Sequence, residues 1–359
     1  MRLAELIALR PVPCAGLLLT LTRRCPLNCA HCSTSSTTAG EEPVAEQLLR
    51  FTESFTDADR PEAVLLTGGE PLLLPGLVGE LAARVRAAGS RTALLSGMFF
   101  ARGGRIPRPV MRAITAVEHF SASLDVFHER EIARRDVFRA VRQVLDSGVP
   151  ASFHLTGSGP RDPYLAELTS EIRREFDDRV PMLVNHVRAV GRAAAWAGVG
   201  ARTGAGHQAL PCAMAAWPVV AFDGAVLACC NQRTVDLRPV PDHLALGHIA
   251  TDDWATVRRR SLSSPILRMV RALGPARLYE RYAPEAAGAG YCDGCRGLTE
   301  QTGLVAAVTR DASGPVGELL DQEAARTQAA AGPAALLKRY GCAPYAPLVT
   351  LPDLTGNRR

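Results

Sequence analysis

Hydrophobic and polar positions follow two alternating patterns along the first half of the chain. Short apolar runs suited to buried strands are separated by longer stretches in which apolar residues recur every three or four positions, as on one face of a helix. The apolar runs cover residues 17–22, 63–67, 92–96, 119–124, 151–156 and 182–187. Six strand–helix units in this order predict a parallel α/β barrel or an open parallel sheet.

The helical stretches carry recognisable end signals. Gly89 and Gly148 directly follow two of them, and glycine readily adopts the left-handed conformation that ends many helices. Asp136 is expected to cap the helix before the fifth strand, because its carboxylate can accept from free backbone N–H groups. Asp162 and Pro163 fit the cap and the first position of the next helix.

The second half of the chain has a different pattern. Residues 193–206 are rich in alanine and glycine and predict a linker. Residues 217–230 predict a hairpin that turns at Gly224, and an arginine-rich, largely helical stretch follows. Residues 323–340 predict a further helix with a break at Gly332, which precedes a proline.

Composition narrows the class of protein. The chain has 359 residues, of which 47% are hydrophobic and 21% charged, and this balance is typical of a soluble globular protein. Its net charge of +5 fits an anionic cosubstrate or an acidic partner but is too small to indicate nucleic acid. Early charges and prolines (Glu5, Arg10, Pro11 and Pro13) interrupt any signal-peptide core, and no apolar run is long enough to cross a membrane. The ten cysteines therefore predict metal or redox use in a reducing cytoplasm, rather than disulfides.

Polar and glycine-rich residues follow the predicted strands at the point where each strand ends. Residues 25–32 follow the first strand, residues 68–71 the second, Ser96 and Gly97 the third, and Asp125 the fourth. Because the carboxyl ends of parallel strands meet at one edge of the sheet, we expect the chemistry there.

The first of these segments places Cys25, Cys29 and Cys32 at C-x3-C-x2-C spacing. Three thiolates on one loop can bind three irons of a cubane, which leaves the fourth iron open to a small molecule. The alternative is structural zinc with His31 as the fourth ligand. Zinc sites favour C-x2-C pairs, however, and His31 is confined between two cysteines on a tight loop.

This loop resembles the signature of the radical S-adenosylmethionine (SAM) superfamily. Gly68-Gly69-Glu70-Pro71, after the second strand, resembles a second motif of that family. The resemblance covers residues 17–193 and implies a partial (β/α)6 TIM-like barrel that holds a 4Fe–4S cluster and SAM. It further implies that the cluster cleaves SAM to methionine and a 5′-deoxyadenosyl radical, which takes a hydrogen atom from a substrate.

The resemblance also implies which residues meet SAM. The Gly-Gly-Glu-Pro loop would receive its amino group, and residues at the third and fourth strand ends would contact its ribose and carboxylate. Arg188 and Arg192 can meet the SAM carboxylate or an acidic substrate, or they can hold the junction between domains. Serine and aspartate at strand ends also serve as helix caps, and Val126 departs from the glycine common in the family. The implied set is Gly68, Gly69, Glu70, Pro71, Ser96, Ser123, Asp125 and Arg188.

The C-terminal cysteines resemble the auxiliary-cluster extensions called SPASM and twitch domains. The implied ligands of a second 4Fe–4S cluster are Cys212, Cys229, Cys292 and Cys295. Zinc is the alternative. A full SPASM domain has another cysteine soon after its C-x2-C pair, whereas residues 296–303 contain none, so one auxiliary cluster is favoured over two. Cys230 is an alternative ligand or a buried thiol, Cys14 is expected to act as a small hydrophobic residue, and Cys342 is isolated.

Three units are therefore expected: a radical SAM core over residues 15–193, a SPASM/twitch-like auxiliary-cluster domain over 207–300 and a helical tail over 301–359. His128 and Glu129 follow the fourth-strand loop and are weak candidates for proton transfer, with a polar helix N-terminus as the alternative.

The leading functional hypothesis is hydrogen abstraction from a ribosomally made peptide by a maturase that forms an oxidative modification or a crosslink. The alternative is dehydrogenation or epimerisation of a sugar-type or nucleoside-type metabolite, and a third hypothesis is a non-enzymatic iron–sulfur or zinc protein.

Expected partners are a reductase with flavodoxin, or a ferredoxin, as electron donor. A separate peptide-recognition protein is also expected, because the segment before Cys25 is short. We expect no nucleic acid and no membrane.

Overall fold

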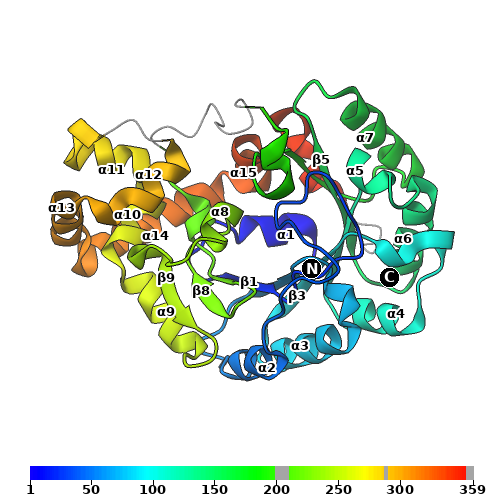
Figure 1. Cartoon of the computed structure of the whole chain (residues 1–359), viewed down its shortest axis with the longest axis horizontal. Coiled ribbons are helices and arrows are strands. Elements are labelled where there is room, and N and C mark those ends of the chain that lie inside the picture. Colours follow the sequence, from blue (N-terminus) through cyan, green and yellow to red (C-terminus); the bar gives the residue numbers. More distant parts are fainter. Residues whose placement is uncertain (199–209, 287–289, 353–359) are drawn as a thin grey trace.

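A parallel sheet forms the centre of the computed structural model, which describes residues 1–198, 210–286 and 290–352 (Figure 1). Six strands lie side by side in chain order, and each is parallel to the next. They are β1 (Gly16–Thr20), β2 (Ala63–Thr67), β3 (Arg91–Ser96), β4 (His119–Ser123), β5 (Ala151–Gly157) and β6 (Met182–His186). The predicted apolar runs match these strands to within one or two residues, and the partial barrel expected for the first half is confirmed.

Helices cover the outer face of this sheet, along the bottom and right of Figure 1. They are α2 (Ala45–Glu53), α3 (Pro75–Ala87), α4 (Arg108–Thr115), α6 (Arg134–Asp146) and α7 (Pro163–Glu175). The short α5 (Val126–Glu129) lies instead at the carboxyl end of β4. Gly89 and Gly148 have φ angles of +78° and +88° just beyond α3 and α6, as predicted. The carboxylate of Asp162 accepts from the Tyr164 N–H at the start of α7, which confirms that cap.

The predicted cap of α6 is wrong. The helix begins at Arg134, with Ala133 in the capping position, so Asp136 lies inside the first turn. Its carboxylate still gains from the positive end of the helix dipole. It also accepts from the Gly103 N–H at 3.2 Å, and therefore ties the loop after β3 to α6.

The predicted hairpin is confirmed, and it extends the same sheet. Strand β7 (Val219–Val220) pairs in parallel with β1, and β8 (Ala225–Leu227) and β9 (Ala245–His248) continue antiparallel. Gly224 has a φ of +88° at the turn. The strand order is β6-β5-β4-β3-β2-β1-β7-β8-β9, so the C-terminal part of the chain lies directly beside the first strand.

C-terminal helices gather at the left of Figure 1, beside β8 and β9. They are α9 (Trp254–Ser263), α10 (Pro265–Ala272), α11 (Pro275–Tyr282), α12 (Tyr291–Gly297), α13 (Thr302–Ala312) and α14 (Gly314–Ala330). A buried ion pair of 2.6 Å between Arg271 and Asp321 joins α10 to α14. Of the predicted linker, residues 199–206 lie outside the described residues, and residues 191–195 form a short 3-10 helix.

The end of the chain returns to the open edge of the sheet. Helix α15 (Gly332–Tyr340) begins at the predicted glycine, and the 3-10 turns that follow (Ala343–Thr350) pack with it against β6 and α1 (Leu3–Ala8). The Cys342 N–H donates to the Val184 carbonyl at 2.8 Å. The tail therefore closes the side of the partial barrel that has no further strand. Within the described residues, no helix is both long enough and apolar enough to span a bilayer.

Trp254 links the two halves through the core. Its fully buried ring lies edge-on to Phe51 and Phe55, with centroid distances of 6.4 and 5.6 Å. We expect Trp254→Ala to lower the free energy of unfolding by about 3–5 kcal/mol, because it leaves a large cavity. Thermal melting followed by circular dichroism measures this loss. Trp196→Ala removes a half-exposed indole with one hydrogen bond to the Ala30 carbonyl and should cost only about 1 kcal/mol; equal losses in both variants would contradict this account of the core.

Candidate functional site

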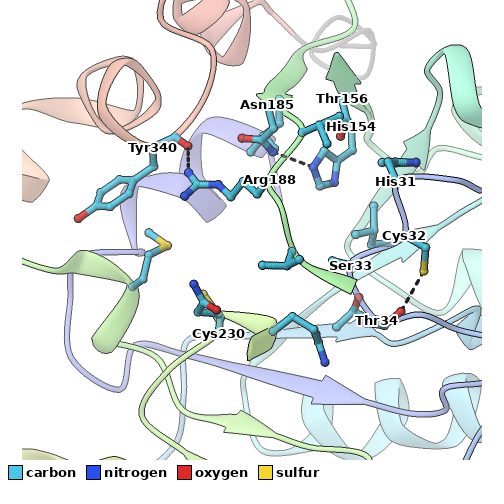
Figure 2. A pocket seen from close by; sticks show the side chains of 18 of the residues that line it. His31, Cys32, Ser33, Thr34, His154, Thr156, Asn185, Arg188, Cys230 and Tyr340 are labelled. Carbon is cyan, nitrogen blue, oxygen red and sulfur yellow. Dashed lines mark hydrogen bonds between the residues drawn. The ribbon is translucent and has the colours of Figure 1, made fainter. Parts of the chain in front are cut away.

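A cavity of about 570 Å³ opens at the carboxyl ends of the strands. The loop after β1, the loop after β2, the ends of β4–β6 and the C-terminal cysteines all contribute to its wall. Both predicted cysteine sets line it: Cys25, Cys29 and Cys32 from one side, and Cys212, Cys229, Cys292 and Cys295 from another. Two groups that are far apart in the sequence therefore face one space, part of which is shown in Figure 2.

Residues from beyond β6 hold the first cysteine loop in place. The Arg192 guanidinium donates to the Cys29 carbonyl at 2.9 Å and to the Ser36 carbonyl at 2.5 Å, and the Arg192 N–H donates to the Cys32 carbonyl at 3.0 Å. Gly191 has a φ of +54°, and a Cβ at this position would lie 2.3 Å from the Cys32 carbonyl oxygen. Arg192 therefore fixes the cysteine loop, a role that was not among those considered from the sequence, and it also lines the cavity.

The thiols of this loop differ in their surroundings. Burial raises the pKa of Cys25 to about 12. Burial also acts to raise the pKa of Cys32, but the Thr34 hydroxyl, the Ser36 N–H and the Arg192 charge outweigh it and bring that pKa below its usual range. Because iron binds thiolates, these donors and the Arg192 charge suit a loop whose cysteines are ligands.

The Gly-Gly-Glu-Pro loop packs against the backbone of the cysteine loop. A Cβ on Gly68 would lie 2.4 Å from the Thr22 carbonyl oxygen, and one on Gly69 would lie 2.3 Å from that of Arg24. The Gly69 N–H donates to Thr22 at 2.6 Å. Only glycine allows this approach, and Gly68 and Gly69 both line the cavity.

Three of the predicted SAM contacts lie behind the cavity wall rather than on it: Glu70, Pro71 and Ser96. The fully buried Glu70 carboxylate accepts from the Ser96 hydroxyl at 3.0 Å and the Gly97 N–H at 2.8 Å. It also accepts from the Leu72 N–H at 3.0 Å. Burial raises its pKa to about 7. The carboxylate thus shapes the loops that line the cavity, instead of pointing into it.

Asp125 organises a polar cluster at the end of β4. Its carboxylate caps α5 and lies 3.0 Å from His128 Nδ1 and 3.3 Å from His31 Nε2. Burial acts to raise the pKa of Asp125, but the two histidines, His128 above all, outweigh it and hold that pKa well below its usual range. Burial likewise acts to lower the pKa of His128, and the Asp125 charge reverses this and raises it to about 10.

The two proton-transfer candidates are placed differently. His128 lines the cavity, whereas Glu129 does not. The Glu129 carboxylate pairs with Arg134 at 2.9 Å and accepts from the Tyr164 hydroxyl. Glu129 is therefore part of an ion-pair network between α5, α6 and α7, as the alternative of a polar helix N-terminus expects, and its side chain does not line the cavity.

The geometry does not favour a single zinc ion among the cysteines. Within the described residues, one group of metal-binding side chains has all its ligand atoms within 4.8 Å of one another. This group is His31, Asp125 and His128. Neither cysteine set meets this criterion. Four thiolates bound to one zinc ion, each about 2.3 Å from it, would lie about 3.8 Å apart and would meet it. His31 faces Asp125, which leaves it unsuited to act as the fourth ligand beside the three cysteines.

Sequence reasoning missed the polar side chains on the inner face of the last two strands of the barrel. His154 and Thr156 of β5 and Asn185 of β6 line the cavity, and Asn185 lies 2.9 Å from His154 Nε2 (Figure 2). Burial lowers the pKa of His154 to about 4, so its ring is neutral. The available signal was the alternation of Ser152, His154 and Thr156 with apolar residues in β5, and an asparagine beside Val184 in β6.

The second cysteine set lies near positive and polar groups; Cys212, Cys229 and Cys295 are partly buried and Cys292 is exposed. Burial raises the pKa of Cys229 to about 12, and it also raises the pKa of Cys212, Cys292 and Cys295. Cys230 also lines the cavity and accepts from Arg10 Nη2 at 3.1 Å. Cys14 and Cys342 are buried in the core and do not line the cavity.

Arg188 lines the same part of the cavity as the second cysteine set. Its guanidinium donates to the Tyr340 carbonyl at 2.7 Å, as Figure 2 shows. The tyrosine hydroxyl in turn accepts from the Ala213 N–H at 3.0 Å, next to Cys212. The C-terminal tail therefore forms one wall of the cavity.

A three-cysteine loop and a glycine-rich loop at the top of a parallel α/β barrel define an iron–sulfur enzyme of the SAM-cleaving class. Residues 19–172 match the family model of the radical SAM superfamily, which identifies the barrel as a radical SAM enzyme core. The family implies a 4Fe–4S cluster and SAM.

Solved structures with a similar fold are only distantly related in sequence. Streptococcus suis SuiB bound to S-adenosylmethionine is 12% identical with a TM-score of 0.51, over 79% of this chain and 77% of that chain. Native anSMEcpe with bound AdoMet and Cp18Cys peptide is 12% identical with a TM-score of 0.47, over 82% and 99%. BtrN in complex with AdoMet and 2-DOIA is 13% identical with a TM-score of 0.42, over 72% and 87%. None of the curated proteins matches the chain.

Glu70→Ala tests the role of the buried carboxylate. We expect SAM affinity to fall about tenfold, because Ser96 and Gly97 lose a charged hydrogen-bond acceptor and the loop can shift. Iron content should stay near normal, since no cysteine is touched. Calorimetry with SAM and iron analysis measure the two effects. Glu62→Ala, at the exposed amino end of β2, is the matched control and should change neither; unchanged SAM affinity in Glu70→Ala would show that the loop does not need this carboxylate.

Proposed function

We propose that this radical SAM enzyme uses Cys25, Cys29 and Cys32 to hold the SAM-binding cluster, and a second cysteine set to hold an auxiliary 4Fe–4S cluster. The observation that carries the proposal is that both sets line one cavity. A bound cluster and SAM supply one-electron cleavage of SAM and abstraction of a hydrogen atom from the substrate.

The chain's own residues position and shield this chemistry. Arg192 and Gly191 fix the cysteine loop, and Gly68 and Gly69 bring backbone close to a ligand in the cavity. Ser123, Asp125 and Arg188 also line the cavity and are proposed to contact SAM. SAM and a substrate bound in this cavity would displace water, which would protect a reactive substrate from side reactions.

His128 is proposed to act as a fixed positive charge at the cavity wall. It lies 3.0 Å from Asp125, and its raised pKa keeps it protonated at neutral pH. A protonated imidazole can donate a hydrogen bond to an anionic group but cannot accept a proton. This favours a binding role, rather than the role of a general base, for His128.

The auxiliary site is proposed to accept an electron. Four thiolates from Cys212, Cys229, Cys292 and Cys295 would leave no iron open to substrate. An auxiliary cluster in the same cavity as the substrate is placed to take one electron from it, which would make the net reaction oxidative. We therefore propose residues 15–193 as the radical SAM core, 207–300 as the auxiliary-cluster unit and 301–359 as a tail that contributes to the cavity wall.

The proposed substrate is a residue of a ribosomally made peptide that inserts into the cavity, with oxidation or crosslinking as the outcome. About 570 Å³ falls within the range of small-molecule sites, so SAM and one inserted side chain would occupy much of it. The second candidate is a small sugar-type or nucleoside-type metabolite. A single auxiliary site, as in twitch domains, favours this small-metabolite substrate.

Iron content and SAM cleavage test the core of the proposal. Anaerobically reconstituted protein should bind about eight irons, and the triple variant Cys25→Ala, Cys29→Ala, Cys32→Ala should bind about four. With dithionite, the parent enzyme should release 5′-deoxyadenosine and the triple variant none. Cys342→Ala removes a buried thiol outside the cavity and should keep both properties. Zinc without iron after anaerobic purification would overturn the assignment.

Cys292→Ala tests the auxiliary site. This exposed residue can be changed with little effect on the core, and we expect product formation to fall by at least about tenfold while SAM cleavage continues. Comparing 5′-deoxyadenosine with modified substrate by mass spectrometry measures the uncoupling. Cys230→Ala is the matched control, and it should keep the second cluster. Normal product formation in Cys292→Ala would make the site structural and remove the oxidative assignment.

A further inference from the structure

The inner face of the barrel carries a polar cluster on its last two strands. His154 and Thr156 are two residues apart on β5, so both side chains point to the same face of the strand, and both line the cavity. Asn185 of β6 is paired in register with Thr156 and lines the cavity as well. Figure 2 shows the three side chains together. Side chains inside such barrels are mostly apolar, so this cluster calls for a polar partner.

Asn185 fixes the orientation of the His154 ring. Its side-chain amide nitrogen lies 2.9 Å from His154 Nε2. An amide N–H group can only donate, so Nε2 accepts, and a neutral ring then carries its proton on Nδ1. Burial keeps the ring neutral, because it lowers the pKa of His154 to about 4 although the Asp125 charge acts to raise it. His154 therefore presents an oriented N–H donor at Nδ1.

Two donors of this cluster are unused within the described part of the chain. Among those residues, no hydrogen bond reaches His154 Nδ1 or the Thr156 hydroxyl, although both residues line the cavity. A ligand oxygen that accepts from them would satisfy both donors. The charges of Asp125 and His128, which act on His154, are paired with each other at 3.0 Å. The burial that keeps the imidazole neutral also disfavours a charged ligand, so the geometry favours an uncharged oxygen.

The cluster borders the place proposed for SAM. Ser123, a proposed SAM contact, is paired in register with His154 across β4 and β5, and both line the cavity. A hydrogen atom is abstracted only from a carbon that lies beside the 5′ carbon of SAM, so the substrate has to fill the cavity next to SAM. An oxygen held by His154 and Thr156 would place a neighbouring C–H group of the substrate there.

We propose that His154 and Thr156 form a substrate subsite for an uncharged oxygen atom, that of an amide carbonyl or a hydroxyl group, and that Asn185 positions the imidazole. The inference rests on the proposed function, since it takes the occupant to be the molecule that loses hydrogen to the 5′-deoxyadenosyl radical. For a peptide substrate, the subsite selects an inserted asparagine, glutamine, serine or threonine side chain over aspartate and glutamate.

Magnetic resonance of isotope-labelled histidine nitrogens tests the subsite on the reconstituted full chain, with SAM present so that its own site is filled. The His154 signals are those that His154→Phe lacks, and in the parent they should report a neutral ring protonated on Nδ1. Acetamide and ethanol are the probes for a carbonyl and a hydroxyl, and the tighter binder names the group. Acetate has the shape of acetamide but carries a charge, and it should bind at least about tenfold more weakly than acetamide.

Two further variants separate binding from positioning. Thr156→Val keeps the shape of the side chain without its hydroxyl, and it should weaken binding of the better probe about fivefold, the loss of one hydrogen bond. Asn185→Leu should populate the second tautomer of His154, an effect that a merely structural role would not produce, and weaken the same probe. Thr115→Val, at an exposed position of α4, is the matched control and should change neither the signals nor the affinity.

Other outcomes overturn the assignment in distinguishable ways. If neither acetamide nor ethanol shifts the His154 signals at any concentration that leaves the protein folded, the wall binds neither group. Tighter binding of acetate would make the substrate anionic. A loss of SAM affinity in Thr156→Val with unchanged probe binding would assign the cluster to SAM. If the parent protein binds no iron, the proposed function itself fails, while the His154 signals still report whether the probes bind.

Discussion

The proposed site depends on the hydrogen bonds by which Arg192 fixes the cysteine loop. A loop with three thiols that must converge on one cluster has little regular structure of its own, so its shape has to be imposed from outside. The guanidinium and backbone of Arg192 bind three carbonyls of that loop, and Gly191 allows the approach. The end of the sixth strand thereby fixes the loop after the first strand across the barrel.

The continuous sheet extends this constraint to the C-terminal half. Because β7 pairs in parallel with β1, the hairpin that carries Cys229 lies beside the strand that leads to Cys25. The tail completes the enclosure from the opposite edge, where Arg188 binds Tyr340. The two cysteine sets, with most of the barrel between them in sequence, thus face one cavity. This proximity would let electrons pass between the two proposed clusters and the substrate.

Much of the fold was predictable because strand and helix periods are local properties. The six apolar runs, the glycine helix ends and the hairpin turn each depend on a few neighbouring residues. The placement of β7 next to β1 was not predictable, because no local pattern specifies which strand edge a distant hairpin joins. For the site, spacing identified Cys25, Cys29 and Cys32, but it could not show that the Glu70 side chain points into the protein and not into the cavity. Ser152, His154 and Thr156 alternate with apolar residues along β5, so a polar face of that strand was predictable from the sequence. Asn185 was missed because it has no such pattern around it.

The buried charge of Arg10 gives a further reason why the C-terminal half packs onto the barrel. Arg10 is only 8% exposed, and among the described residues no carboxylate pairs with it. Its guanidinium instead contacts Cys230 Sγ, the Met214 carbonyl and, at 4.9 Å, the Trp217 ring.

Burying an unpaired cation costs free energy, and so does burying a group of thiolates. If the proposed auxiliary cluster is bound, its thiolates and the arginines that line this part of the cavity would offset each other's charge. Without bound metal the buried thiols keep their protons, as their raised pKa values indicate, and the arginines lose this compensation. Cluster binding and the packing of the C-terminal half onto the barrel are therefore expected to stabilise one another.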